Sequence, residues 1–158
     1  MIFVTIGTQA PFDRFIKMVD EIAANLNEEV IAQTFKSQYK AKKIKTVDFL
    51  APDEFNKLFK EARMIVAHAG MGTIISAMQH QKPIIIFPRI AALGEHRNEH
   101  QMATAKKMKE LGYVHVAFNE KELKDLLLSD NINCLHKLSD SASPTLINSL
   151  SDYINQIN

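Results

Sequence analysis

The segment His68-Ala69-Gly70-Met71-Gly72-Thr73 combines residues that suit anion binding. Gly70 and Gly72 have no Cβ, so a ligand can approach the backbone closely and unusual φ angles cost little. An apolar, strand-like run precedes the segment and a helical pattern follows it. Its free N–H groups would therefore lie at a helix N-terminus, which attracts negative charge, and Thr73 would cap that helix or donate its hydroxyl group. The loop predicts a diphosphate site, with a tight turn whose glycines serve packing alone as the alternative.

A second glycine-bearing loop, Gly7-Thr8-Gln9, follows the apolar run at the N-terminus. Two such loops facing each other favour phosphate binding over packing alone. The chain lacks the pattern GxxxxGK[ST], which disfavours a P-loop nucleotidase. It also lacks GxGxxG after the first apolar run, which disfavours ordinary dinucleotide binding.

A dense group of polar side chains follows the apolar run at residues 84–87 and leads into another helical pattern. Such side chains can recognise sugar hydroxyls and phosphate charge. A solvated, charged helix start is the alternative for any one of them. The candidates for ligand contacts in this group are Arg89, Glu95, His96, Asn98, His100 and Gln101.

Residues 96–100 also match HxxEH, a zinc-binding pattern of metalloproteases. On a helix, His96 and His100 would share one face, as a zinc ion requires, and Glu99 would act as the base. No second helix offers an obvious third ligand, and a zinc hydrolase would leave both glycine loops without a role. We therefore predict no metal and keep the zinc hydrolase as a weaker alternative.

Short apolar runs alternate with helical patterns along the chain, and these elements would position the polar groups. The runs predict strands at residues 2–6, 30–35, 44–49, 64–67, 84–87 and 114–118. Apolar residues at helical spacing predict helices at residues 12–26, 53–62, 73–80, 98–111, 121–127 and about 143–157. Such alternation predicts an α/β fold built from right-handed βαβ units.

Six strands in this arrangement predict a doubly wound, Rossmann-like, mostly parallel sheet in the order 3-2-1-4-5-6, with helices on both faces. In that order the loops after the first and fourth strands lie side by side at the carboxyl edge, where ligands bind in open α/β sheets. These are the two glycine loops. The sequence thus predicts one domain over residues 1–158 with a single ligand site.

Composition narrows the class of protein. Hydrophobic residues make up 46% and charged residues 23% of the 158 residues, as in an ordinary globular domain. The formal net charge of +1 gives no strong field to gather nucleic acid, so we expect no nucleic-acid partner. The single cysteine, Cys134, cannot form an internal disulfide, which favours a cytoplasmic location. No apolar stretch reaches the length of a membrane span.

Four ordered motifs, FVTIGT, IVAHAGMGT, KPIIIFPR and GEHRNEHQ, resemble the C-terminal, donor-binding domain of glycosyltransferase family 28. The similarity spans roughly residues 1–118. The chain is most similar to small stand-alone versions of this domain. These are the soluble subunit of the eukaryotic lipid-linked N-glycan GlcNAc transferase and bacterial exopolysaccharide and capsule transferase subunits. The bacterial type is nearer, because PR is followed by GEHRNEHQ.

The resemblance implies half of a GT-B fold that binds a UDP-sugar without a metal or another cofactor. It implies that the two glycine loops hold the diphosphate, that the segment from Glu95 to Gln101 faces the donor sugar, and that the uracil ring packs near Phe49-Leu50. One position departs from the family pattern. Ser76 stands where members commonly carry a glutamate that holds the ribose hydroxyls, which leaves the identity of the nucleotide open.

The resemblance also implies a membrane-anchored partner subunit that binds a lipid-linked saccharide acceptor and recruits this chain to the inner face of the membrane. We expect transfer of a hexosyl or glycuronosyl residue in polysaccharide biosynthesis. Inverting transfer needs a base, for which Glu95 and His96 are the candidates in this chain and a partner residue is the alternative. A non-catalytic, nucleotide-binding activator of a partner transferase is the alternative function. The predicted C-terminal helix is the segment expected to dock on the partner, and the alternative is that its apolar stripe covers the chain's own sheet.

Overall fold

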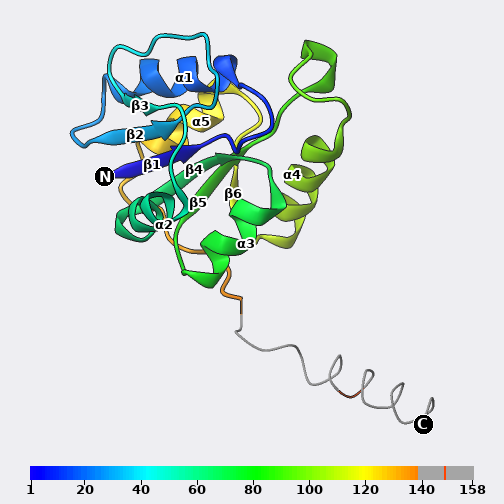
Figure 1. Cartoon of the computed structure of the whole chain (residues 1–158). Helices are drawn as coiled ribbons and strands as arrows, with labels where there is room; N and C mark the ends of the chain where they lie inside the picture. The colour runs from blue at the N-terminus through cyan, green and yellow to red at the C-terminus, as the bar shows by residue number, and fades with distance from the viewer. Residues whose placement is uncertain (139–147, 149–158) are drawn as a thin grey trace.

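The computed structural model describes residues 1–138 and residue 148 of the chain. A six-stranded sheet runs through the described part (Figure 1). Every pair of neighbouring strands is parallel, and the order β3-β2-β1-β4-β5-β6 confirms the predicted doubly wound topology. The strands are β1 (Ile2–Thr5), β2 (Val30–Gln33), β3 (Lys45–Val47), β4 (Met64–His68), β5 (Ile84–Phe87) and β6 (His115–Val116).

Helices cover both faces of this sheet (Figure 1). α1 and α5 pack on one face, and α2, α3 and α4 pack on the other. A short 3-10 helix, η1, follows β5. The helices are α1 (Asp13–Ala23), α2 (Pro52–Glu61), α3 (Met71–Gln79), η1 (Ala91–Leu93), α4 (His100–Leu111) and α5 (Glu120–Leu127).

Burial on both faces explains why the central strands are continuously apolar. Consecutive residues of β1 lie on opposite faces of the sheet. Phe3 is fully buried in the core on one face, and Val4 is fully buried in the core on the other. α1 presents an apolar stripe that includes Phe15 and Val19 to the core on its side of the sheet. The sheet is therefore a rigid platform whose carboxyl edge carries the strand-to-helix loops.

The elements differ from the sequence prediction mainly at their ends. β2 stops at Gln33 because Phe35 and Lys36 adopt positive φ angles of 26° and 55°, which a strand does not accommodate. η1 was not predicted, and it ends at Gly94 in the left-handed conformation. α4 begins at His100, two residues after the predicted start, so the segment before it is a turn.

Asp20 organises the long connection between β2 and β3 from its buried position on α1. Its carboxylate accepts hydrogen bonds from the Tyr39 hydroxyl (2.9 Å) and from the backbone N–H groups of Lys42 (2.9 Å), Lys43 (2.7 Å) and Ile44 (3.0 Å). Burial alone would raise the pKa of Asp20, but these hydrogen bonds lower it below its usual value. The connection is thereby fixed against α1.

None of the helices in the described part is long and apolar enough to span a bilayer. The helix predicted at about residues 143–157 lies outside the described residues except for residue 148, so the docking role expected of it stays a prediction.

We expect the substitution Asp20→Asn to lower the free energy of unfolding by roughly 2–3 kcal/mol, because it leaves buried donors without an anionic acceptor. Urea unfolding at pH 7 measures this loss. Asp125→Asn is the matched control, since Asp125 is exposed and forms an ion pair with Lys121 on the surface of α5. Equal losses in both variants would contradict the assigned role of Asp20.

Candidate functional site

A cleft of about 930 Å³ lies at the carboxyl edge of the sheet, over the ends of β1, β4 and β5. It brings together the loops after these three strands and the start of α4. The predicted site residues that line it are Gly7, Thr8, Gln9, His68, Gly70, Met71, Gly72, Thr73, Arg89, Glu95, His96, His100 and Gln101. Residues that the sequence interpretation missed also line it, namely Ile6, Ala10, Ala69, Arg97 and Thr104.

A second cavity of about 320 Å³ adjoins the cleft and shares Gly7, Thr8 and Thr73 with it. Phe49 and Leu50, near which the uracil ring is predicted to pack, line this cavity, and the Phe49 side chain is 58% exposed. Asn98 is the predicted site residue that lines neither cavity. Its side-chain oxygen accepts the N–H of His100 (3.2 Å), so Asn98 shapes the start of α4.

The N-terminus of α3 forms one wall of the cleft. Gly70 is the N-cap residue, and no side chain caps the helix. The first hydrogen bond of the helix runs from the N–H of Ile74 to the carbonyl oxygen of Gly70 (3.2 Å). The N–H groups of Met71, Gly72 and Thr73 precede Ile74 and therefore have no intrahelical acceptor. Together with the helix dipole, these donors make this wall suitable for an anion.

The imidazole of His68 lies between the two glycine loops. A Cβ at Gly7, whose φ is +71°, would lie 3.0 Å from Cε1 of His68. A Cβ at Gly70 would overlap Nε2 of His68 and would lie 2.8 Å from Cε1. Gly7 and Gly70 are therefore required for packing against this ring. Gly72 differs, because a Cβ there would meet no atom within 4 Å.

His68 is held neutral in this position. Burial of the imidazole, reinforced by the positive charge of Arg89, lowers its pKa from 6.5 to about 4. Two buried side-chain polar atoms lack a hydrogen-bond partner within the described residues: Nδ1 of His68 and Oε1 of Gln33. Gln33 is 3% exposed and lines the second cavity. Unpaired buried polar atoms are costly, and both belong to residues that line the two cavities.

Arg89 was predicted to contact a ligand phosphate, but the structure places its guanidinium group among backbone carbonyls. The residue is 2% exposed. Its terminal nitrogens donate to the carbonyl oxygens of Ile6 (3.1 Å), Ala10 (2.7 Å), Pro11 (2.6 Å) and Glu95 (3.3 Å). Arg89 thus binds the loop after β1 to the loop after β5 and contributes its charge to the cleft from a distance.

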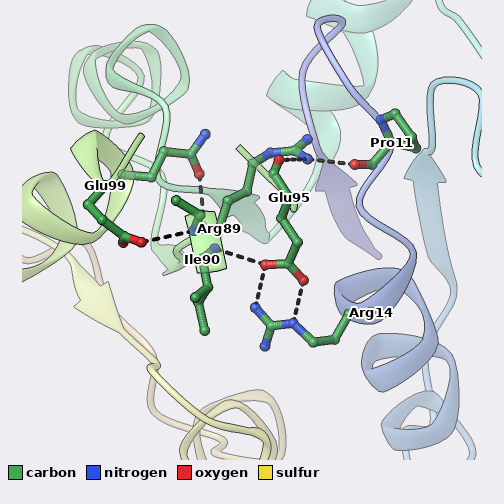
Figure 2. A network of polar contacts seen from close by, with 8 residues as sticks. Pro11, Arg14, Arg89, Ile90, Glu95 and Glu99 are labelled. Atoms are coloured by element: carbon green, nitrogen blue, oxygen red, sulfur yellow. Dashed lines mark hydrogen bonds and ion pairs between the residues drawn. The ribbon is translucent and has the colours of Figure 1, made fainter. Parts of the chain in front are cut away.

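Glu95 was predicted as a base, and its carboxylate is fully engaged (Figure 2). Oε1 accepts from Nε of Arg14 (2.5 Å), and Oε2 accepts from Nη2 of Arg14 (2.8 Å) and from the N–H of Ile90 (2.8 Å). A carboxylate held by three donors has little capacity to take a substrate proton. The geometry assigns Glu95 a structural role, and Arg14 is a partner that no sequence motif indicated.

His96 lines the cleft with a defined ring orientation. Its Nδ1 lies 3.1 Å from the carbonyl oxygen of Asn98 and 3.4 Å from the backbone nitrogen of the same residue, so it donates to the first or accepts from the second according to the tautomer. Nε2 has a free lone pair in the tautomer in which Nδ1 donates. Gln101, predicted to contact a sugar, is 8% exposed, and its Oε1 accepts the backbone N–H of Arg89 (3.2 Å).

The zinc alternative has no geometric support. His96 lies in the turn before α4, so it does not share a helix face with His100. Within residues 1–138, no group of three histidine, cysteine or acidic side chains is arranged to hold a metal ion.

Ser76 lies in the middle of α3 and lines neither cavity.

The family model of the glycosyltransferase family 28 C-terminal domain matches residues 1–157. The chain belongs to this family. It is therefore a glycosyltransferase-type domain, and the resemblance stated from its four motifs is confirmed. A comparison with curated proteins gives no match.

Solved structures with this fold include other glycosyltransferases. The NMR structure of ALG13 is 20% identical, with a TM-score of 0.59 and 94% of each chain covered. MurG of Acinetobacter baumannii is 16% identical, with a TM-score of 0.58, and the match covers 79% of this family 28 chain and 39% of MurG. The spinosyn forosaminyltransferase SpnP is 17% identical, with a TM-score of 0.55, and the match covers 79% and 33% of the two chains. The likeness confirms the predicted half of a GT-B fold.

The two glycines of the loop before α3 are expected to respond differently to substitution. Gly72→Val should leave the thermal midpoint within about 3 °C of the wild type, because a side chain there meets open space. It should nevertheless abolish anion binding in the cleft, measured by titration with UDP. Gly70→Ala should instead lower the stability by roughly 1–3 kcal/mol, because it displaces a buried ring. Unchanged UDP affinity in Gly72→Val would contradict the assignment of this wall.

The depressed pKa of His68 predicts acid sensitivity. Between pH 6.5 and about 4 the unfolded chain binds a proton that the folded imidazole excludes, so stability falls as the pH falls. From pH 7 to pH 5, His68 should account for a loss of roughly 2 kcal/mol in the free energy of unfolding. Urea unfolding of His68→Gln at both pH values should lack this increment. The exposed His80→Gln variant should keep it, and a wild-type-like loss in His68→Gln would refute the assignment.

Proposed function

We propose that this chain is the donor-binding subunit of a glycosyltransferase. It binds a UDP-sugar, without a metal or other cofactor, and a membrane-anchored partner subunit binds a lipid-linked saccharide acceptor. The transferred group is a hexosyl or glycuronosyl residue, and the pathway is the biosynthesis of a polysaccharide. The observation that carries the proposal is the meeting of two glycine loops and a free helix N-terminus at the topological switch point of the sheet.

The wall formed by α3 supports binding of the diphosphate. The N–H groups of Met71, Gly72 and Thr73 supply donors without other acceptors, and Gly72 leaves room for a close approach. Arg89 lines the cleft and contributes a positive charge there. The same donors would stabilise the negative charge that develops on the departing diphosphate.

The second cavity supports binding of the nucleoside. It continues from the diphosphate wall through Thr8 and Thr73, and the exposed ring of Phe49 offers a surface on which a base can pack. The unpaired amide oxygen of Gln33 and the side chain of Asn56 provide polar groups in the same cavity. Ser76 lies too far along α3 to line it, so ribose contacts must come from other residues.

His96 is the base candidate that the geometry favours in this chain. In the tautomer whose Nδ1 donates to the Asn98 carbonyl oxygen, Nε2 has a free lone pair, and the residue lines the cleft. In this proposal Nε2 takes the proton of the acceptor hydroxyl as that oxygen attacks the anomeric carbon and UDP departs. A base supplied by the partner is the alternative.

The comparison with ALG13 supports the proposal of a separate partner. The chain spans only 39% of MurG and 33% of SpnP, whereas it matches 94% of ALG13. The described cleft is lined by the loops after β1, β4 and β5 and by the start of α4, and we propose that an acceptor-binding wall is added to it. We propose that this wall is a membrane-anchored subunit and that it recruits the chain to the inner face of the membrane.

Calorimetric titration of the chain alone tests donor binding. We expect UDP to bind with one-to-one stoichiometry and UMP to bind about tenfold more weakly. The reason is that each hydrogen bond to a charged phosphate contributes roughly 1.5–3 kcal/mol. Added EDTA should not change the affinity. Absence of UDP binding, or binding that requires a divalent cation, would overturn the proposed function.

Transfer assays with the partner subunit separate a transferase from a non-catalytic activator. The variant Gly72→Val should lose both UDP binding and sugar transfer to the lipid-linked acceptor. If transfer persists in a variant that no longer binds UDP, the partner carries its own donor site and this chain is an activator.

A further inference from the structure

We propose, on the basis of the proposed function, that Arg14 is a positioning residue for the donor sugar. It does not line the cleft, and it acts through Glu95 on the loop that carries His96 and Arg97. Figure 2 shows the arrangement, with Glu95 lying between Arg14 of α1 and Ile90 at the start of the loop after β5.

The guanidinium group of Arg14 is a fixed anchor. It belongs to the first turn of α1, and its central carbon lies 4.9 Å from the ring centroid of Phe87 and 5.5 Å from that of Phe12. Both rings are fully buried in the core. The orientation of the guanidinium group is therefore set by the sheet and α1, and its paired bonds with both oxygens of Glu95 transfer that orientation to the carboxylate.

The carboxylate in turn fixes the loop. Oε2 of Glu95 also accepts the N–H of Ile90, and Oε1 of Glu99 accepts the N–H of Ala91 (3.0 Å), so two acidic side chains close residues 90–99 into a compact unit. Arg89 adds one longer bond to the backbone oxygen of Glu95 (3.3 Å). The short, paired contacts of Arg14 are thus the strongest polar connection from α1 to this unit.

The diphosphate contacts do not depend on this connection. In the proposed function they come from the start of α3 and from the loop after β1, whereas His96 and Arg97 reach the cleft from the loop after β5. Loss of the Arg14–Glu95 pair should therefore displace the contacts to the sugar and leave the contacts to UDP in place. This separation distinguishes a positioning residue from a residue that only stabilises the fold.

The test compares UDP with UDP-GlcNAc, UDP-glucose, UDP-galactose and UDP-glucuronic acid by calorimetry on the chain alone. We expect one of these sugars to bind more tightly than UDP in the wild type. In Arg14→Ala and in Glu95→Gln, the ratio of the affinity for this UDP-sugar to the affinity for UDP should fall by about tenfold or to one. The affinity for UDP itself should change less than about threefold. The double variant should lose no more than either single variant. Arg14→Lys, which keeps the charge, should restore part of the gain.

Arg63→Ala is the matched control. Arg63 forms a similar paired contact with Glu28, far from the cleft, and its removal should leave the sugar preference unchanged. The inference is overturned if the sugar preference survives in Glu95→Gln, if the two single losses add in the double variant, or if the wild type shows no preference for any UDP-sugar over UDP. Failure of the wild type to bind UDP at all would instead overturn the proposed function.

Discussion

The buried guanidinium group of Arg89 is the interaction on which the geometry of the site depends. Four backbone carbonyls surround it, three from the loop after β1 and one from the loop after β5. Burial of a guanidinium group has a low free-energy cost only when its N–H donors have acceptors. Both loops are therefore constrained to the positions that supply these acceptors. The positive charge of Arg89 then lies at the cleft, which this residue lines.

Packing around His68 imposes the second constraint. The neutral ring fills the space between Gly7 and Gly70, which brings the loop after β1 against the loop before α3. Packing and ligand binding were opposed explanations for the glycines, and the structure divides them by position. Gly7 and Gly70 make room for His68, whereas Gly72 leaves space that no protein atom occupies.

Hydrophobic periodicity was sufficient to predict the fold, because buried parallel strands such as β1 and β5 have an uninterrupted apolar signature. The chain order of the loops then predicted which of them meet. Such patterns could not predict contacts that depend on the direction in which a side chain points. The pairing of Glu95 with Arg14 joins residues 81 positions apart, and nothing in either local sequence indicates it. Gln33 was overlooked because it was read only as part of a strand, although its place at the end of β2 was a usable signal.

The most direct test of the account is an amide ¹H–¹⁵N chemical-shift map of the chain during titration with UDP. The account predicts the largest shifts at Gly7 and Thr8, at Met71 to Thr73, and around Phe49 and Leu50, because these amides surround the two connected cavities. The amides of α5, on the opposite face of the sheet from α3, should stay unchanged. Shifts concentrated away from the carboxyl edge, or none at the start of α3 under saturating UDP, would contradict it.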